Sequence, residues 1–283
     1  MNQQNNYRTF MLLALLIITG DITGQIGGFN KIRWEKEKIA PGLVWKSVHT
    51  ILYDSVPQNI NILYVNLKKR KISINYDPQK NIAVSKQASA TNAIAAVNGG
   101  FFNIKNGGST TYIKIDGKII DSDTAKKWSR NANMTGSILI TDGKKLFIER
   151  SMTNTWYDGY QEYDDILVTG PLLIEAARTV KLPETSLVTT RHPRTAIGIR
   201  NNKKVILITL DGRTEEAAGM ALNELAELMI SLKCRDAVNL DGGGSTTMWI
   251  YGKPFNGVVN MPCDNKKFDH LGERAVSDIL IIR

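Results

Sequence analysis

The chain has 283 residues, which is long for one ordinary domain, yet single α/β and all-β domains reach this length and no internal boundary is required. Hydrophobic residues make up 42% and charged residues 22%, so the sequence can build a sizeable core and is not that of a disordered protein. The 36 Lys and Arg residues outnumber the 27 Asp and Glu residues, giving a net charge of +9. No arginine-rich run, zinc-finger spacing or RNP-like aromatic block accompanies this charge, so we expect no nucleic-acid partner.

Residues 1–24 have the composition of an export signal. Arg8 precedes nine unbroken apolar residues, Phe10 to Ile18, and small residues such as Gly20 follow them. Nine residues are too few to span a bilayer, which needs about 20, so no stable membrane anchor is expected. The sequence therefore predicts an exported protein, periplasmic or extracellular. Residues 25–90 are predicted to be the strand-rich beginning of the domain that residues 91–283 complete.

The segments that follow have the alternation of antiparallel strands. Apolar and polar residues alternate in segments 43–53, 60–67 and 72–76, and a short helix is predicted within residues 85–95. Asn98, Gly99 and Gly100 then predict a strand that turns sharply and leaves a polar side chain at its end. An ordinary Asn-Gly turn is the alternative. Further along, Asp116-Gly117 and Asp142-Gly143 each divide two alternating runs, which is typical of tight hairpins.

Cysteine and histidine usage sets limits on disulfide and metal chemistry. Cys234 and Cys263 could form a disulfide in an exported protein, and two separate buried thiols are equally compatible with the sequence. The three histidines are scattered, and none has the spacing of a zinc site. No cofactor or metal is therefore expected, although two carboxylates described next could hold a hard divalent cation.

Two apolar runs end in the same tripeptide, Leu-Asp-Gly. Residues 205–210 lead to Asp211, and a second run leads to Asp241. Between them, apolar residues recur at helical spacing from Leu222 to Leu232. A helix between two such strands predicts a crossover that joins a parallel pair, with both strand ends on one edge of the sheet. We therefore expect Asp211 and Asp241 to lie close together, where ligands of such sheets bind.

The second tripeptide opens the most unusual stretch of the chain, VNLDGGGSTTM at residues 238–248. Three successive glycines are tolerated where the backbone takes positive φ or lies directly against another group. The backbone N–H groups of residues 242–244, together with the hydroxyl of Ser245, could ring an anion beside Asp241. A glycine-rich hairpin or bulge between two strands is the alternative. Arg194 and Arg274 each precede an apolar strand, where a guanidinium suits the capture of phosphate or carboxylate.

Six motifs, taken in order, resemble the phosphodiester glycosidase family. They are NGGFF at 98–102, TGPLLI at 169–174, HPRTAIG at 192–198, DGR with GMALNELA at 211–226, NLDGGGSTTM at 239–248 and GERAV at 272–276. The resemblance covers roughly residues 92–280. It implies a hydrolase that cleaves the sugar to phosphate bond of a glycosyl-1-phosphodiester and releases free sugar and a phosphomonoester. Ala218 and Ala221 stand where relatives often have hydroxyl residues, so no role is assigned there.

The resemblance and the residue patterns together give an expected fold and site. The fold class is α+β or mixed α/β, mostly an antiparallel sheet, with a strand-helix-strand unit carrying the active-site loops. Asp211 and Asp241 are the expected catalytic residues, which stabilise an oxocarbenium-like state, attack it or activate water. Because phosphate leaves readily, cations that hold its charge matter more than an acid. The expected substrate-binding residues are Asn98, Gly99, Arg194, Arg213, Asn239, Gly242, Gly243, Gly244, Ser245 and Arg274.

Three other classes of function fit parts of the same pattern. The first is a non-catalytic envelope module that binds anionic glycans through the same basic, glycine-lined region. The second is a nucleotide-binding domain, which the missing GK[ST] ending and the expected export disfavour. The third is a serine hydrolase at Ser245, but GGGSTT is not GxSxG and no paired histidine is evident.

Overall fold

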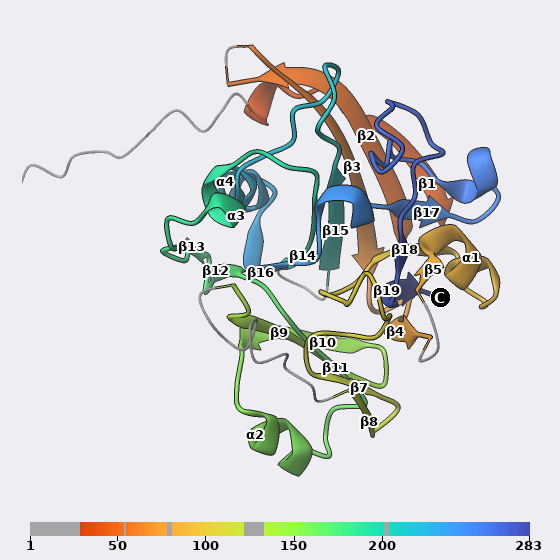
Figure 1. Cartoon of the computed structure of the whole chain (residues 1–283), viewed down its shortest axis with the longest axis vertical. Coiled ribbons are helices and arrows are strands. Elements are labelled where there is room, and N and C mark those ends of the chain that lie inside the picture. Colours follow the sequence, from red (N-terminus) through yellow and green to blue (C-terminus); the bar gives the residue numbers. More distant parts are fainter. Residues whose placement is uncertain (1–28, 54, 78–80, 122–132, 201–203) are drawn as a thin grey trace, which may run out of the picture.

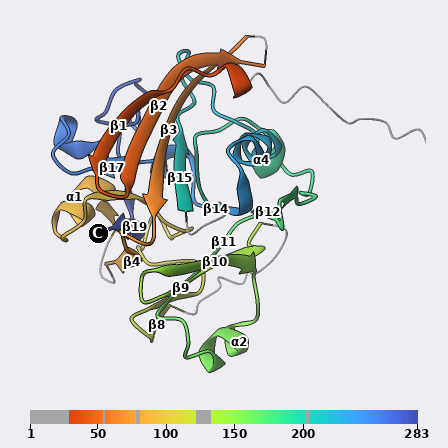
Figure 2. The same ribbon diagram turned by 180° about the vertical axis from the view of Figure 1, so that it is seen from behind.

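The computed structural model describes residues 29–53, 55–77, 81–121, 133–200 and 204–283. The predicted export signal lies outside this part of the chain. The described residues form sheets of eight, five, four and two strands, and every recorded strand pair is antiparallel. The expectation of a mostly antiparallel α+β fold is therefore confirmed. Figures 1 and 2 show the eight-stranded sheet above the five-stranded sheet from opposite sides.

The strand order of each sheet places segments that are far apart in sequence side by side. The eight-stranded sheet has the order β1 (Glu35–Ala40), β2 (Leu43–Leu52), β3 (Val56–Asn66), β15 (Lys204–Leu210), β14 (Arg194–Arg200), β16 (Cys234–Asn239), β12 (Leu172–Glu175) and β13 (Arg178–Thr179). The five-stranded sheet has the order β10 (Lys145–Arg150), β9 (Gly136–Thr141), β11 (Asp165–Thr169), β7 (Ile113–Ile115) and β8 (Lys118–Asp121). The four-stranded sheet has the order β17 (Met248–Ile250), β6 (Ala95–Asn98), β19 (Asp278–Ile282) and β4 (Ile72–Tyr76), and β18 (Ala275–Val276) pairs with β5 (Ile82–Ala83).

The helices are few and short. The α-helices of the described residues are α1 (Val84–Ser89), α2 (Asn154–Gly159), α3 (Ser186–Thr189) and α4 (Leu222–Ser231). Single turns of 3-10 helix occupy Phe29–Lys31, Gly243–Ser245 and Phe255–Gly257. The helices predicted near residues 85 and 222 are both present, and the first is shorter than expected.

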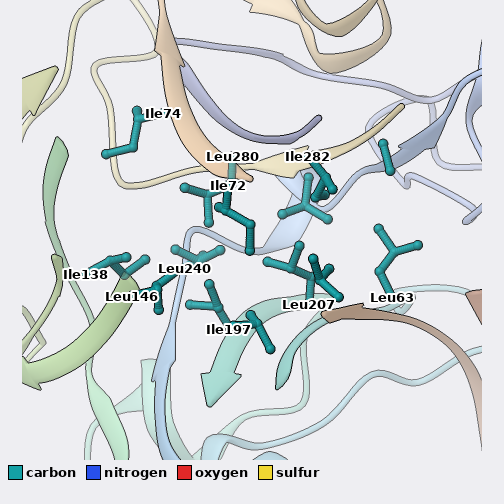
Figure 3. Close-up of a cluster of buried hydrophobic side chains, with 14 of the residues drawn as sticks. Leu63, Ile72, Ile74, Ile138, Leu146, Ile197, Leu207, Leu240, Leu280 and Ile282 are labelled. Atoms are coloured by element: carbon teal, nitrogen blue, oxygen red, sulfur yellow. The ribbon is translucent and has the colours of Figure 1, made fainter. Parts of the chain in front are cut away.

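One hydrophobic core joins the inner faces of the three larger sheets. Because side chains alternate along a strand, Leu207 of β15 points into this core while Ile206 points to the opposite face. Figure 3 shows the shared core, in which Leu207 lies with Ile138 of the five-stranded sheet and Leu280 of the four-stranded sheet. Apolar burial therefore joins the sheets, together with hydrogen bonds such as that from the Thr195 hydroxyl of β14 to Oδ1 of Asn98 in β6.

Each outer sheet face has its own helical cover. Leu225 and Met229 of α4 pack on the outer face of the eight-stranded sheet, where α3 also lies. Val84 of α1 covers the four-stranded sheet, and Tyr157 of α2 covers the five-stranded sheet. No helix in the described part of the chain is long and apolar enough to cross a membrane.

Both predicted Asp-Gly hairpins are confirmed. Asp116 and Gly117 connect β7 to β8 with φ of 48° and 75°, and Asp142 and Gly143 connect β9 to β10 with φ of 51° and 63°. Two successive residues at positive φ match the right-handed twist of the flanking strands, and Asp-Gly tolerates this backbone at low cost.

The predicted crossover between adjacent parallel strands requires a correction. β15 and β16 run in the same direction, but β14 lies between them and is antiparallel to both. β14 immediately precedes β15 in the chain and pairs with it along seven residues, which leaves the other edge of β14 for β16. The two strand ends still share one edge of the sheet, with one strand more between them than predicted.

Both cysteines are free thiols. Cys234 lies at the start of β16 and packs in the core beneath α4, whereas Cys263 lies beside Arg213. Burial raises the pKa of the Cys234 thiol to about 12, so this cysteine is a small buried apolar residue. Of the two alternatives that the sequence left open, the structure shows the separate thiols.

Candidate active site

Two Leu-Asp-Gly turns meet at one edge of the eight-stranded sheet. Asp211 follows β15 and Asp241 follows β16, with the beginning of β14 between them. The backbone of Pro193 contacts both turns. A Cβ on Gly212 would lie 2.9 Å from its nitrogen, and a Cβ on Gly242 would lie 2.7 Å from its oxygen. Both turns therefore need glycine because residue 193 occupies the space between them.

Asp241 is less buried as a residue than Asp211. Its N–H donates to the oxygen of Gly99 at 3.0 Å, and its carbonyl accepts from Nδ2 of Asn98 at 2.7 Å. Its Oδ1 accepts from the N–H of Gly242 at 2.9 Å. Burial raises the pKa of Asp241 to about 6, although the Ser245 hydroxyl and the Gly242 amide favour the charged form. A carboxyl group with this pKa changes its protonation close to neutral pH, which suits a catalytic role.

A second carboxylate, that of Asp278, lies behind this turn. Asp278 begins β19 and is 1% exposed, and its carboxylate accepts from the N–H of Gly100 and the hydroxyl of Ser277. A Cβ on Gly99 would overlap its Oδ1. After burial, the charge of Asp278 is a further cause of the raised pKa of Asp241. The Asn-Gly-Gly turn therefore admits a buried acid beside Asp241, and Asp278 occupies the space next to Gly99.

The glycine loop, residues 242–244, lets two arginines lie directly against the backbone. Gly243 has φ of 62°, and a Cβ there would lie 3.0 Å from Nη2 of Arg213. A Cβ on Gly244 would overlap both partners of the ion pair between Arg274 and Asp264. Arg213 is exposed, and the Arg274 side chain is 25% exposed. Two guanidinium groups therefore flank the loop that follows Asp241.

The backbone N–H groups of this loop do not form the anion-binding ring predicted from the sequence. Those of Gly242, Gly243 and Ser245 donate to protein oxygens and close the turn. Gly244 has the one amide in the loop without an acceptor among the described residues. Positive charge at the site therefore comes mainly from arginine side chains.

Three consecutive hydroxyls behind the loop are buried without satisfied hydrogen bonds. Ser245, Thr246 and Thr247 are 0% exposed, and their side-chain oxygens have no hydrogen-bond partner among the described residues. The Ser245 hydroxyl lies near enough to the Asp241 carboxylate to lower its pKa without reaching hydrogen-bond geometry. Buried hydroxyls of this kind are ordinarily satisfied by ordered water or by a ligand.

The carboxylate of Asp211 is enclosed by hydrogen-bond donors of the protein. It is 1% exposed, and its carboxylate accepts from Nδ2 of Asn260 at 2.7 Å, Nδ2 of Asn59 at 2.7 Å and the N–H of Met261 at 2.9 Å. Burial raises its pKa, and these three donors oppose the rise. Asn260 also donates to the Thr246 oxygen at 3.0 Å. Asp211 therefore holds the segment after β17 against the glycine loop, and this geometry argues against the direct substrate contact predicted for it.

Arg194 points away from the glycine loop. Alternation along β14 places Arg194 and Ala196 on the face that α3 and α4 cover. Its Nε donates to the Met220 oxygen at 2.8 Å, and its Nη2 donates to the oxygens of Leu187 at 2.7 Å and Thr190 at 2.8 Å. The side chain is 2% exposed. These contacts contradict the predicted phosphate-binding role, and Arg194 instead satisfies carbonyl groups at the end of α3.

The two asparagines predicted to bind substrate, Asn98 and Asn239, form hydrogen bonds with other protein groups. Asn98 is 0% exposed, and its Oδ1 accepts from the Thr195 hydroxyl at 2.7 Å and the Thr247 N–H at 3.1 Å. Asn239 is 1% exposed and donates from Nδ2 to the Gly170 oxygen at 2.9 Å, while its Oδ1 has no hydrogen-bond partner among the described residues. Both residues therefore fix the loops around Asp241.

Sequence reasoning missed three charged or titratable neighbours of the site. Asp264 had no recognisable signal, and Asp278 could have been noticed as an acid at the start of an apolar terminal strand. His192 lies two residues before Arg194, and its Nδ1 is 3.5 Å from Nη2 of Arg213. Burial, followed by the charges of these two arginines, lowers the pKa of His192, which favours the neutral imidazole.

The part of the chain that the structure describes has no metal-binding cluster beside these residues. Within the described ranges, no group of three or more His, Cys, Asp or Glu side chains is arranged to hold a metal ion. The donors to the Asp211 carboxylate are amides, and the donor to the Asp241 carboxylate is the amide of Gly242.

Comparison with known proteins places this arrangement in a family. A family profile described as phosphodiester glycosidase matches residues 91–283, which is more than half of the chain. The chain belongs to the phosphodiester glycosidase family. The matched region contains both Leu-Asp-Gly turns, the glycine loop and the two arginines beside it.

Similar members of the phosphodiester glycosidase family include vertebrate enzymes. The human N-acetylglucosamine-1-phosphodiester alpha-N-acetylglucosaminidase is 25% identical over 190 residues, which cover 62% of this chain and 35% of that protein. The SPbeta prophage-derived uncharacterized protein YomE of Bacillus subtilis is 35% identical over 105 residues, covering 37% of this chain and 15% of that protein. The matched regions thus span about a third or less of these relatives.

Solved structures show the same fold over most of the chain. The catalytic domain of zebrafish N-acetylglucosamine-1-phosphodiester alpha-N-acetylglucosaminidase, auto-inhibited by its pro-peptide, superposes with a TM-score of 0.69 at 20% identity. It covers 89% of this chain and 88% of that one. A hypothetical protein from Synechocystis superposes with a TM-score of 0.67 at 14% identity, covering 89% of this chain and 64% of that one.

Proposed function

We propose that this phosphodiester glycosidase family member is a hydrolase that cleaves the sugar to phosphate bond of a glycosyl-1-phosphodiester. Water adds to the anomeric carbon, the bond from that carbon to the phosphate oxygen breaks, and free sugar and a phosphomonoester are released. The observation that carries the proposal is the position of Arg213 and Arg274 against the glycine loop beside Asp241. The similarity to enzymes named for a sugar-1-phosphodiester supports the same substrate class.

The two arginines supply the charge that this reaction needs. The phosphate departs with the electron pair of the broken bond, and guanidinium groups match its oxygens in bidentate geometry. Asp264 pairs with Arg274 and fixes its orientation, and Gly244 provides the space for that pair. Because these cations are in place before the bond breaks, they stabilise the developing anion at little reorganisation cost.

Asp241 is assigned the catalytic role at the anomeric carbon. Above pH of about 6 its carboxylate is ionised and favours the positive charge that develops there, either by attack or by activation of water. Asp211 is assigned a positioning role, because its carboxylate accepts hydrogen bonds from three protein donors near the site. Asp241 thus takes the direct role that the sequence divided between the two acids.

The proposal is tested with a panel of sugar-1-phosphodiesters. The purified chain is incubated with each compound while free sugar and phosphomonoester are measured. We expect hydrolysis of at least one member, and the Asp241→Asn variant should lose about a hundredfold or more in kcat while still binding it. Binding without hydrolysis by the unaltered chain across the panel would favour the non-catalytic anionic-glycan module.

The proposed place of action is outside the cytoplasm. The support is the composition of residues 1–24, a charged start followed by nine apolar residues and then small ones. Expression of the full chain with fractionation of the cells should recover a protein shortened by about these residues in the exported fraction. Recovery of the unshortened chain in the cytoplasm would contradict export.

A further inference from the structure

A second groove lies at the opposite end of the strands of the eight-stranded sheet from the glycine loop. β14 begins at Arg194 near that loop and ends at Arg200, and six steps of about 3.3 Å separate the two by roughly 20 Å. A cavity of about 850 Å³ opens there along β10, the edge strand of the five-stranded sheet. A second cavity of about 590 Å³ adjoins it across the ion pair of Arg150 and Glu175. We call the two together the distal groove.

Positive charge predominates in the distal groove. The larger cavity is lined by the cations Lys144, Lys145, Arg150, Arg200 and Arg235 and by three carboxylates. The smaller one adds Arg178 and Lys181. Two of the carboxylates are already neutralised, because Glu175 pairs with Arg150 and Asp236 pairs with Arg235. Most of the remaining cations therefore have no carboxylate partner among the described residues.

Protection of an exposed strand edge accounts for only part of this charge. Lysines on an edge strand prevent unwanted pairing with other chains, which would explain Lys144 and Lys145 beside β10. Arg178 and Arg200, however, come from β13 and β14 of the other sheet. Their convergence on the same groove is not required by strand protection.

Arg200 lines the larger cavity and is less exposed than the lysines beside β10. Its Nε is buried and has no hydrogen-bond acceptor among the described residues. Its guanidinium carbon lies 5.8 Å from the centre of the Tyr64 ring, which helps to fix the group without using its donors. Because Tyr64 packs on the sheet face that α4 covers, the Arg200 guanidinium lies toward that face and adds to the positive potential at this end of the sheet.

The rest of the wall indicates what kind of anion fits. Phe147 is 40% exposed and Met152 is 41% exposed, and both line the larger cavity, where apolar surface suits the face of a sugar ring. Glu149 carries a carboxylate with no ion-pair partner among the described residues, and it can accept hydrogen bonds from hydroxyls. Cations, apolar surface and hydroxyl acceptors together match a sugar polymer that bears acidic groups.

We propose that the distal groove is a binding site for an anionic polysaccharide. The acidic groups of the polymer contact Lys145, Arg178 and Lys181, and its sugar rings lie against Phe147. This site is separate from the glycine loop, and its occupation does not depend on the proposed hydrolysis.

The test measures binding of a fluorescent oligogalacturonate of about eight units by the whole protein. The groove variant replaces Lys145, Arg178 and Lys181 with Gln, and all three side chains are exposed. The matched control replaces Lys36, Lys38 and Lys86 with Gln, which removes the same charge from exposed positions that line neither cavity. We expect the groove variant to lose about tenfold or more in affinity, with little change in the control.

Three further arms separate the possible outcomes. Added salt should weaken binding, and a neutral dextran should bind at least tenfold more weakly than the oligogalacturonate, about the effect of losing the charge contacts. Hydrogen exchange should show protection in β10 and β13 when the oligosaccharide is present. Equal losses in the groove and control variants would overturn the proposal. So would binding of a DNA oligonucleotide of matched charge as tightly as the oligogalacturonate, or protection confined to the glycine loop.

Discussion

Asp211 and Asp241 follow the same Leu-Asp-Gly sequence, and their surroundings give them different chemistry. Asp211 is enclosed by the donors of Asn59, Asn260 and Met261 and is 1% exposed. Asp241 is more exposed, and one protein amide donates to its Oδ1. A carboxylate that already accepts three strong hydrogen bonds is a poor nucleophile or base, so the less satisfied acid is the better catalytic candidate.

The titration of Asp241 should respond in opposite directions to two substitutions. The charge of Arg274 lowers its pKa and that of Asp278 raises it, around a value of about 6 that burial sets. Arg274→Gln should therefore raise the pKa of Asp241, and Asp278→Asn should lower it. Carboxyl carbon NMR across the titration measures both shifts. Identical values in the two variants would show that neither charge reaches Asp241.

The same raised pKa makes a prediction for stability. Because the pKa of Asp241 is higher in the folded state than the ordinary value of 3.8, the folded protein binds this proton more tightly. Its contribution to stability is fully present below the ordinary pKa and is lost as pH rises through about 6. The free energy of unfolding of the unaltered chain, minus that of Asp241→Asn, should fall across this window in denaturant titrations. A difference that rises with pH would contradict the assignment.

Arg194 and Arg213 provide a matched pair of arginines with different roles. Arg194→Met removes donors from three buried carbonyls and should lower the Tm by roughly 5–10 °C while leaving KM almost unchanged. Arg213→Gln alters an exposed side chain at the glycine loop and should leave the Tm unchanged while kcat/KM falls about tenfold to a hundredfold. Thermal unfolding and steady-state kinetics of both variants check this. A fall in kcat/KM without a fall in Tm for Arg194→Met, with the opposite for Arg213→Gln, would support the predicted phosphate-binding role of Arg194.

The glycine loop shows how one short element can be organised by its neighbours. The absent side chain of Gly242 leaves space for the backbone of Pro193. That of Gly243 leaves space for Arg213, and that of Gly244 for the pair of Arg274 and Asp264. The run therefore reflects close approach of other protein groups, and at Gly243 also a positive φ. The sequence indicated that something lies against these glycines, but not that arginine side chains occupy much of that space.

Substitutions in the loop should lower activity through the arginines. Gly244→Ala should displace Arg274 and Asp264, and a shift of about 1 Å in such a group costs about a hundredfold in rate. Gly159→Ala is the control, since a Cβ there meets nothing within 4 Å. Kinetics of the two variants, with circular dichroism to confirm folding, decide the matter. Equal activities would mean that the arginines do not act in the reaction.

Local patterns predicted local elements well. Asp142-Gly143 requires positive φ at both positions and formed the expected hairpin, and the helical spacing from Leu222 to Leu232 formed α4. The position of Arg194 could not be predicted, because its direction depends on which face of β14 meets the helices. The insertion of β14 between β15 and β16 is equally invisible to periodicity, which does not determine strand order.

The site was predicted best where two sequence signals converged. The shared Leu-Asp-Gly ends brought Asp211 and Asp241 to one sheet edge, and the triple glycine marked the contact with Arg213 and Arg274. The sequence drew attention to Asn98 but suggested a ligand-binding role for it. Its actual hydrogen bonds, to Thr195 and to the segment after the loop, join residues about a hundred or more positions apart and could not be predicted. Long-range partners of this kind have no local signature.

At the scale of the whole molecule, three sheets share one core, and the first strands are part of it. β3 pairs with β15 along seven residues, and β4 pairs with β19 along five. Both strands precede residue 91, where the family match begins. The segment before the matched region therefore completes two of the sheets that position the site.

A fragment of residues 91–283 should not fold by itself. Without β3 and β4, the apolar strands β15 and β19 would expose hydrophobic surface and unpaired backbone groups. We expect no cooperative thermal transition and no near-ultraviolet circular dichroism from this fragment, in contrast to residues 29–283. A cooperative transition at the same Tm in both would show that the earlier strands are dispensable.

The central claim is that the bond broken joins the anomeric carbon to the phosphate oxygen. It is tested most directly by running the reaction in water enriched in the heavy oxygen isotope and weighing both products by mass spectrometry. With the arginines holding the phosphate and Asp241 acting at the sugar, the heavy oxygen should enter the free sugar and be absent from the phosphomonoester. Heavy oxygen in the phosphomonoester, with none in the sugar, would mean attack at phosphorus and would contradict the roles given to these residues.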